Sequence, residues 1–415
     1  MLGVFYLEIV RAQMRLVTPL VLGGADPSGP PELRAPAFKG LLRYWYRAVD
    51  PAYQSREARV FGGVGPGEGQ ACFLLRVTGE HLQTATFHLN ERRDGKDARA
   101  GLRYLTYSLT ARGRERLFFK PGQTITLHFL FKKRPGEQQD RRAILASIWL
   151  LGHLGGAGAR IRRGMGTVAL TRWSVVDPAG HEVEAWPEMQ ELPIAHGAAS
   201  VDEWLRRFES GLSCLQRWFG EADTRHPTHT TLGPGSRFVL LELPPARRGE
   251  DAWENALNEA GLALHRFRLR RGVARADGDG DYHRAKRLLL RLDPASGPAR
   301  REAPARARTG REIAPERVAF GLPLQFRFRS LQGRSIMFRG KQHDRSASRL
   351  WIRPIDLGDR QALLFALLPS PLLAPGEPIR AEVRRERVEL DLPGDHILME
   401  FLDSLSGREV TWPCG

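Results

Sequence analysis

Residues 34–48 read RAPAFKGLLRYWYRA, and their pattern predicts an amphipathic α-helix. Apolar residues recur at intervals of three and four, which places them on one helical face that packs against a core. This predicted buried face consists of Phe38, Leu41, Leu42, Trp45 and Val49. Pro36 fits the first helical turn, where its missing N–H costs no hydrogen bond. Because Arg34 is not a capping residue, the first backbone N–H groups stay open to an anion such as phosphate.

Lys39, Arg43 and Arg47 form a second stripe along the same predicted helix, four residues apart. Like charges at this spacing repel and destabilise a helix by about 0.2–0.5 kcal/mol per pair. Two interpretations follow from this repulsion. The stripe is either a solvated basic face, or a surface that binds an anion. In the second case we expect that replacing Lys39 and Arg43 weakens anion binding without making the folded chain less stable.

The composition favours a nucleic-acid partner. The chain has 415 residues, enough for two domains with separate cores, and 42% of them are hydrophobic, as in globular proteins. It carries 63 Lys and Arg against 47 Asp and Glu, for a formal net charge of +16, and only 7 of the basic residues are lysine. Arginine suits bidentate phosphate contacts and stacking on bases, so RNA or DNA is favoured over an anionic membrane.

Metal and cofactor sites are not indicated by the sequence. Its 3 cysteines lie far apart and form no Cys-x-x-Cys pair, which argues against a zinc site and a disulfide framework. Asp277, Asp279 and Asp281 alternate as in a calcium loop, but Leu288 stands where that loop needs a glutamate. We therefore expect no metal and no cofactor.

The apolar segments argue against a membrane location. Glu8 and Arg11 interrupt the first apolar stretch, so it does not read as a signal peptide. No later apolar run approaches the length of a membrane span. We expect a cytoplasmic protein with no membrane partner.

A second chemical feature is the glycine-rich loop, residues 152–170, GHLGGAGARIRRGMGTVAL. A helix is predicted before it and a strand after it, the reverse of the order that a dinucleotide-binding fingerprint requires. No Gly-Lys-Ser/Thr follows, so it is not a P-loop. Backbone amides near Gly156 and Gly158 could approach a phosphate closely, and arginines could add charge-assisted contacts. The alternative is a hairpin loop with three solvated arginines, Arg160, Arg162 and Arg163.

Periodicity along the rest of the chain predicts a mixture of strands and helices. Strands are expected at residues 5–16, 71–77, 124–131, 167–175, 237–243, 318–330, 350–355 and 363–368. Helices are expected at residues 57–61, 141–151, 201–218, 253–264 and 397–405. A polar, proline-containing stretch at residues 177–199 is a plausible domain boundary.

Two further basic segments follow in the second half. Residues 265–272, HRFRLRRG, interleave an aromatic residue with basic ones, which suits single-stranded RNA through Arg266 and Arg268. An exposed edge strand is the alternative. Residues 272–316 are rich in Ala, Pro and Arg and partly of low complexity, so we expect a mobile basic insertion there.

The motif R-x-P-x-F-K-G-x-x-R-x-W-x-R at residues 34–47 resembles the first-helix signature of RAMP proteins, the RNA-binding subunits of CRISPR effector complexes. It is most similar to the first subunit of the Cmr, or type III-B, complexes. The L-G-G-A-D turn at residues 22–26 and the G-G-x-G-x-R-x-R-R-G-x-G loop also resemble this family. So does VAFGLPLQF followed by RSASRLWIRPI, which departs from the pattern at Arg349, where the family often has proline.

The resemblance implies an α+β fold of two ferredoxin-like (β-α-β-β-α-β) RAMP domains in tandem, with insertions. The domains would be residues 1–185 and residues 186–415, the second with the mobile basic insertion near residues 272–316. It also implies a noncatalytic, RNA-binding subunit that caps the guide-RNA 3′ end region and helps to capture target RNA for antiviral defence. Guide RNA, target RNA and other RAMP subunits of the Cmr complex would be its partners. Because base pairing reads the sequence, the protein need hold only backbone and shape.

The expected RNA-binding residues come from the three basic segments. They are Arg34, Lys39, Arg43, Arg47, Gly156, Gly158, Arg160, Arg162, Arg163, Arg266 and Arg268. In a ferredoxin-like domain the first helix and the glycine-rich loop can approach each other. We therefore expect the helix stripe to face the loop arginines across a groove that holds RNA backbone.

The alternative function is a metal-independent endoribonuclease of the guide-RNA-processing RAMP type. Such an enzyme needs a general acid or base near the scissile 2′-OH, and His153 is the best candidate among 12 histidines. A packing or helix-end role for His153 is the simpler reading. Asp26 lies where the slicing subunit of the same complexes has a catalytic aspartate, and we expect it to shape the turn instead.

Overall fold

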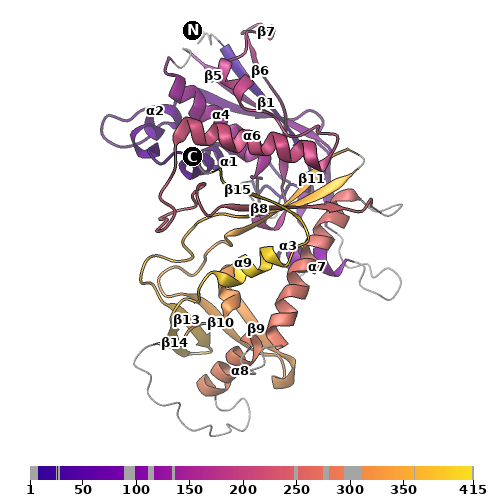
Figure 1. The fold of residues 1–415 in the computed structure, drawn as a ribbon, viewed down its shortest axis with the longest axis vertical. Helices are drawn as coiled ribbons and strands as arrows, with labels where there is room; N and C mark the ends of the chain where they lie inside the picture. Colours follow the sequence, from indigo (N-terminus) through magenta and orange to yellow (C-terminus); the bar gives the residue numbers. More distant parts are fainter. Residues whose placement is uncertain are drawn as a thin grey trace. The chain divides into compact units, whose positions relative to one another are not determined.

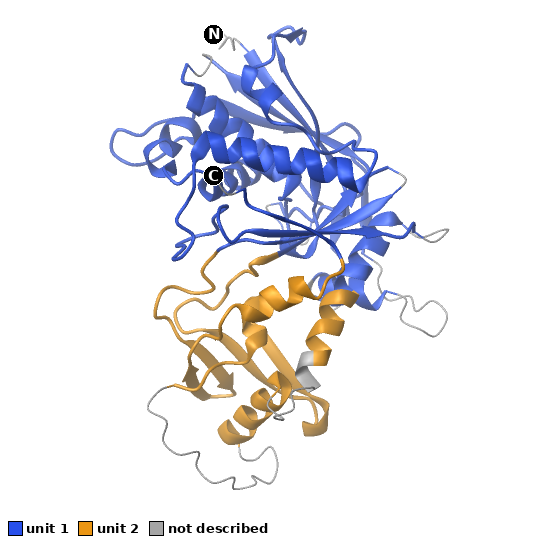
Figure 2. Ribbon diagram, viewed as in Figure 1, with its two compact units in different colours: residues 1–261, 351–369, 407–415 blue, residues 262–350, 370–406 orange. Residues whose placement is uncertain are grey.

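The chain forms two compact units (Figure 2) in a computed structural model. Unit 1 comprises residues 1–261, 351–369 and 407–415, and unit 2 comprises residues 262–350 and 370–406. The structure describes residues 8–24, 26, 29–87, 99–110, 116–132, 136–246, 251–273, 280–293, 311–358 and 360–413. Much of the predicted mobile insertion, including Asp277 and Asp279, lies outside the described residues.

The first sheet has the strand order β2-β5-β1-β6-β7 with antiparallel pairing. Its strands are β1 (Glu8–Leu16), β2 (Phe73–Thr78), β5 (Thr124–Phe131), β6 (Val168–Val176) and β7 (Glu182–Val183). Alternation in TITLHFLF directs Ile125, Leu127 and Phe129 to the core, where each is fully buried. Helices α1 (Ala35–Val49) and α4 (Gln138–His153) pack together on that face of the sheet (Figure 1).

The second sheet has the order β11-β12-β8-β15 and lies almost wholly in unit 1. Its strands are β8 (Arg237–Leu243), β11 (Leu350–Asp356), β12 (Gln361–Leu367) and β15 (Arg408–Thr411). The third sheet lies in unit 2 and has the order β14-β13-β10-β9. Its strands are β9 (Leu324–Phe328), β10 (Arg334–Gly340), β13 (Ile379–Val383) and β14 (Glu386–Leu390). Helix α8 (Asp281–Leu292) packs on β9 and β10 within unit 2.

The remaining elements connect these sheets. A small pair joins β3 (Thr84–Thr86) to β4 (Leu117–Phe119). The other helices are α2 (Glu57–Phe61), α3 (Ala100–Thr110), α5 (Pro187–Glu191), α6 (Val201–Phe219), α7 (Ala252–Val273) and α9 (His396–Asp403). Among the described helices, none combines the length and the apolarity that crossing a membrane requires.

The prediction of a mixed fold with helices and strands is confirmed, and its sheets are antiparallel. The structure excludes one alternative and shortens one predicted strand. Residues 265–272 continue helix α7 and form no strand, because leucine and arginine favour helix as strongly as the alternation favours a strand. The strand expected at residues 318–330 begins only at Leu324, after a 3-10 turn at Glu316–Phe320.

Candidate nucleic-acid interface

Helix α1 matches its sequence prediction closely. Arg34 is its N-cap in an extended conformation, without a side-chain hydrogen bond, and Pro36 lies in the first turn. The apolar face is buried as expected through Phe38, Leu42 and Trp45, whereas Leu41 is only half-buried. The face of α1 that carries the basic stripe is therefore turned away from the core.

Most of the basic stripe is neutralised within the protein. The Arg47 guanidinium contacts the Glu57 carboxylate at 2.8 Å, and the Arg43 guanidinium lies 3.6 Å from the same group. Arg43 also donates to the carbonyl oxygens of Phe61, at 3.0 Å, and Gly62, at the end of α2. These contacts offset the repulsion between the cations of the basic stripe without an external anion. They also argue against the expectation that replacing Arg43 leaves the fold no less stable, because Arg43 satisfies terminal carbonyls of α2.

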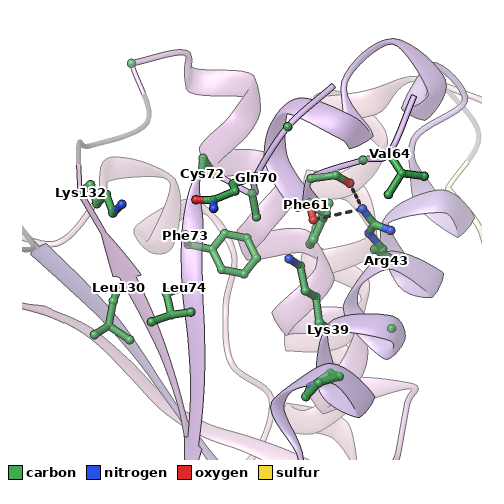
Figure 3. Close-up of a pocket in the computed structure, with 17 residues that line it drawn as sticks. Lys39, Arg43, Phe61, Val64, Gln70, Cys72, Phe73, Leu74, Leu130 and Lys132 are labelled. Atoms are coloured by element: carbon green, nitrogen blue, oxygen red, sulfur yellow. Dashed lines mark hydrogen bonds between the residues drawn. The ribbon is translucent and has the colours of Figure 1, made fainter. Parts of the chain in front are cut away.

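Lys39 has a different environment at the mouth of a pocket of about 1020 Å³ (Figure 3). Its ammonium lies 5.8 Å from the centre of the Phe73 ring, and within the described part of the chain it forms no ion pair. Burial, followed by the charge of Arg43, lowers the pKa of Lys39. A half-buried cation beside a second cation is a favourable point for an anion to bind.

The far rim of the pocket comes from β2, the end of β5 and the segment before β2 (Figure 3). Lys132 adds a second exposed ammonium, and Gln70 adds an exposed carboxamide. Cys72 is not a nucleophile here, since burial raises the pKa of its thiol to about 12 and the sulfur contacts the Val60 carbonyl oxygen at 3.4 Å. Leu74 is 57% exposed and completes the apolar part of the wall.

The glycine-rich loop is shaped by its own packing. Gly158 and Gly166 have positive φ values of 80° and 64°, which favour glycine. A Cβ atom on Gly158 would lie 2.2 Å from the Val21 carbonyl oxygen, and one on Gly166 would lie 1.9 Å from that of Ala157. Close approach of the chain to itself therefore explains these glycines. Gly156 is buried and bridges to Thr167.

The loop arginines bind other parts of unit 1. Arg160 donates to the Leu105 carbonyl oxygen at 2.6 Å and lies 5.4 Å from the Tyr107 ring centre, and burial lowers its pKa. Arg162 lies 4.7 Å from the centre of the Trp351 ring and donates to the Tyr44 hydroxyl at 3.2 Å. Arg163 is half-buried at the end of the 3-10 turn Ile161–Arg163.

The loop and α1 meet through an aromatic cluster. Tyr44, Trp45 and Trp351 lie within 5.2–6.0 Å of one another by their ring centres. Arg162 reaches α1 at Tyr44, which lies about 140° around the helix from Lys39 at roughly 100° per residue. The structure thus joins the two motifs, but on a flank of α1 different from the one that carries Lys39.

Arg353 is a functional candidate that the sequence did not single out. It is 4% exposed, and its guanidinium donates to the carbonyl oxygens of Gly155, of Gly152 at 2.5 Å and of Val168 at 2.6 Å. Burial lowers its pKa to about 9, so it stays cationic at neutral pH. Arg353 ties the RLWIRPI segment to the glycine-rich loop, and only the joint appearance of the two motifs could have hinted at this contact.

His153 is a packing residue. It is 2% exposed, its ring stacks on Trp149 at 4.0 Å, and its Nδ1 contacts the Trp149 carbonyl oxygen at 2.8 Å. Its Nε2 accepts the Ala195 backbone N–H at 2.9 Å. Burial lowers the pKa of His153 to about 3, so the ring has neither the accessibility nor the proton affinity of a general base.

The other candidates have separate surroundings. Asp26 is exposed, and its carbonyl oxygen accepts the Gly29 N–H at 3.1 Å in a turn. In unit 2, Arg266 is exposed on α7, and Arg268 lies 4.3 Å from the centre of the Phe320 ring. Phe267 packs edge-on against Phe401. No group of three potential metal ligands occurs among the residues that the structure describes.

Comparisons with known proteins agree with the sequence motifs. Residues 13–169 match the model of the RAMP superfamily. The CRISPR system Cmr subunit Cmr1-1 of Pyrococcus furiosus is 28% identical over 234 residues, which are 54% of this chain and 62% of that protein. The aligned part of the chain therefore spans less than two thirds of this curated relative.

Solved structures extend the likeness to the fold. The crystal structure of Cmr1 from Pyrococcus furiosus, in its apo form, matches with a TM-score of 0.56 and 18% identity, covering 97% of this chain and 98% of that one. This match shows a shared fold. A chain of a type III-B Cmr-beta complex bound to cognate target RNA has a TM-score of 0.48 and 12% identity over 89% of this chain and 97% of that one, too low to support an argument.

Proposed function

We propose that this chain, a homologue of the Cmr1 proteins with a RAMP-superfamily match at residues 13–169, is an RNA-binding subunit of a type III-B CRISPR effector complex. In this role it caps the guide-RNA 3′ end region and helps to capture target RNA for antiviral defence. It contributes binding and leaves catalysis to other subunits. Its partners are guide RNA, target RNA and neighbouring RAMP subunits of the Cmr complex.

The strand orders support two ferredoxin-like domains in tandem. In the first sheet, β1, β2, β5 and β6 have the order β2-β5-β1-β6, with α1 after β1 and α4 after β5. The second sheet has the equivalent order, β11-β12-β8-β15, with α7 after β8 and α9 after β12. Both follow the β-α-β-β-α-β scheme, so we assign the domains to residues 1–185 and 186–415. The strands of the third sheet are insertions in the second domain.

The pocket beside Lys39 is the observation that carries the proposal. It holds an ammonium without an ion pair among the described residues, a second ammonium at Lys132 and the carboxamide of Gln70. Phosphate groups of a bound RNA would pair with these side chains. Arg34 is exposed at the N-terminus of α1 and extends the positive surface, whereas Arg47 is exposed but paired with Glu57. Arg160, Arg162 and Arg163, which hold the glycine-rich loop in place, would act mainly by positioning.

The environment of His153 weighs against the endoribonuclease alternative. Both ring nitrogens are engaged with backbone groups, and burial holds the pKa near 3. A general base must reach the 2′-OH and accept its proton near neutral pH. His153 meets neither requirement, so the binding function is the better-supported one.

The test compares two lysines with the same change of charge. Lys39→Gln removes the pocket ammonium, and Lys120→Gln removes an exposed ammonium that contacts Gln83 at 3.2 Å. RNA affinity is measured by fluorescence anisotropy between 50 and 300 mM salt. For Lys39→Gln we expect weaker binding to every RNA sequence, with a log–log salt slope lower by about 0.7, because phosphate contacts carry no base information. Equal affinities for both variants and the native chain would refute the pocket as the RNA site.

A second test concerns assembly. Tagged chain purified from its native host should carry guide RNA together with other RAMP subunits. Recovery of the chain without RNA and without those subunits would contradict the proposed role.

A further inference from the structure

On the open face of the first sheet, residues form rows that run across strands β1, β5 and β2. Strands β1, β5 and β2 alternate, so that the residues between the buried ones point away from α1 and α4. The register places Arg11 opposite His128, and His128 opposite Arg76. Three side chains that are or can become cationic therefore lie side by side across three neighbouring strands. We call Arg11, His128 and Arg76 the cationic row.

The cationic row has no acidic partner among the residues that the structure describes. Like charges directly opposite each other destabilise a sheet. Within the described residues neither Arg11 nor Arg76 forms an ion pair. By contrast, Arg15, four residues after Arg11 on the same face, contacts Asp356 at 3.0 Å. His128 contacts the Thr78 hydroxyl at 2.8 Å through Nε2, which fixes the orientation of its ring. The burial of His128, followed by the charges of Arg11 and Arg76, lowers its pKa.

The next row on the same face is apolar. The register places Ile9 opposite Leu130, and Leu130 opposite Leu74. Leu74, the second residue of the edge strand β2, is 57% exposed and adds apolar surface to this row. Two residues along a strand correspond to about 7 Å, so the apolar row runs parallel to the cationic row at that distance.

We propose that single-stranded RNA crosses this open face, with its phosphates along the cationic row and its bases against the apolar row. Strands lie about 4.8 Å apart, so the cationic row extends over roughly 10 Å and can follow a short run of backbone. Apolar contact for bases beside positive charge for phosphates is the usual composition of a single-strand binding surface. This assignment rests on the proposed RNA binding and adds a second surface to it.

Continuity with the pocket favours RNA over an acidic protein segment. Leu74 and Leu130 of the apolar row also line the pocket that contains Lys39. Strand β2 forms the edge of the sheet between the pocket and the open face. An RNA strand bound at Lys39 can therefore pass around this edge onto the open face. The arrangement provides one path from the helix side of the sheet to its open side.

The experiment compares two double variants with the same loss of charge. Arg11→Gln with Arg76→Gln removes the ends of the cationic row. Arg206→Gln with Arg217→Gln removes two exposed arginines of α6 and serves as the control. Both are titrated with a fluorescein-labelled single-stranded RNA, with circular dichroism as the check on folding. The exposed Arg76→Gln change alone is a second variant that leaves the half-buried Arg11 in place.

We expect the sheet variant to bind about tenfold more weakly than the control and to lower the log–log salt slope by about 1.4, for two lost phosphate contacts. Cross-linking of 4-thiouridine RNA to peptides of β2 and β5 should decrease in parallel. Binding equal to that of the control would overturn the inference. It would also be overturned if polyglutamate occupied this face while the RNA stayed bound to the protein. If Lys39→Gln alone weakens binding, only the sheet assignment fails, whereas a native chain that binds no RNA removes the proposed function as well.

Discussion

Acidification should destabilise unit 1 through His153, and the size of the effect follows from its burial. The pKa of His153 is about 3 in the folded chain, compared with 6.5 for an ordinary histidine. Below pH 6.5 the unfolded chain takes up a proton at this position and the folded chain does not. Stability is therefore fully present above pH 6.5 and is lost as the pH falls toward 3. The loss between pH 7 and pH 5 is about 2 kcal/mol, at 1.36 kcal/mol per pH unit once the unfolded group titrates.

The matched variant is His153→Gln, whose carboxamide can still donate and accept a hydrogen bond but does not titrate. Its free energy of unfolding should fall by about 2 kcal/mol less than that of the native chain between pH 7 and pH 5. Other groups that titrate, such as His128 and His196, are common to both proteins and cancel in the comparison.

Urea unfolding followed by tryptophan fluorescence suits this measurement, because all 9 tryptophans belong to unit 1. Unfolding free energies would be determined at half-unit intervals of pH for both proteins. A pH dependence that is the same in both, within about 0.5 kcal/mol, would show that the His153 ring is protonated in the folded chain. Such a result would also remove the argument that His153 is unsuited to general base catalysis.

Three other perturbations separate structural roles from binding roles. Arg43→Ala should cost about 1–2 kcal/mol in the free energy of unfolding, because carbonyl groups at the end of α2 lose their donor, whereas Lys39→Ala should be nearly neutral. Chemical denaturation measures both variants, and equal values would contradict the Arg43 contacts. Arg353→Met should cost at least about 3 kcal/mol, since three buried carbonyl oxygens lose their donor, and a chain of native stability would show that the guanidinium does not anchor the glycine-rich loop. Cys72 should resist iodoacetamide at pH 8 until urea is added, because its thiol has a pKa of about 12; peptide mass spectrometry checks this, and rapid labelling of the native chain would contradict its burial.

Local periodicity was sufficient for the elements with a single clear pattern. Strand β5 at Thr124–Phe131 and strand β8 at Arg237–Leu243 have the predicted bounds, and α1 differs by one residue at each end. In β5 the alternation, and in α1 the helical spacing, coincides with burial on one side, whereas β8 is buried through the consecutive residues Phe238, Val239 and Leu240. At residues 265–272 periodicity left an edge strand open as an alternative, but the segment is helical and its packing depends on Phe320 and Phe401.

The chemistry of the candidate site depended on contacts that no local pattern contains. Glu57 neutralises Arg43 and Arg47 only because α2 folds back beside α1. The cationic row requires the register of three strands from distant parts of the chain. Motif resemblance identified α1 and the glycine-rich loop, but it could not distinguish residues that stabilise the loop, such as Arg160, from residues that remain available for RNA.

The position of β8 in the second sheet has a consequence for how the chain is made. Arg237 of β8 pairs with Glu409 of β15, 172 residues later. Strand β12, on the other side of β8, is also made only after β9 and β10. At a synthesis rate of about 5–20 residues per second, β15 is made about 10–30 seconds after β8. The first sheet has all its strands by Val183 and can fold meanwhile. A nascent chain halted before residue 408 would present an unpaired edge of β8, the kind of surface that chaperones bind and that otherwise aggregates.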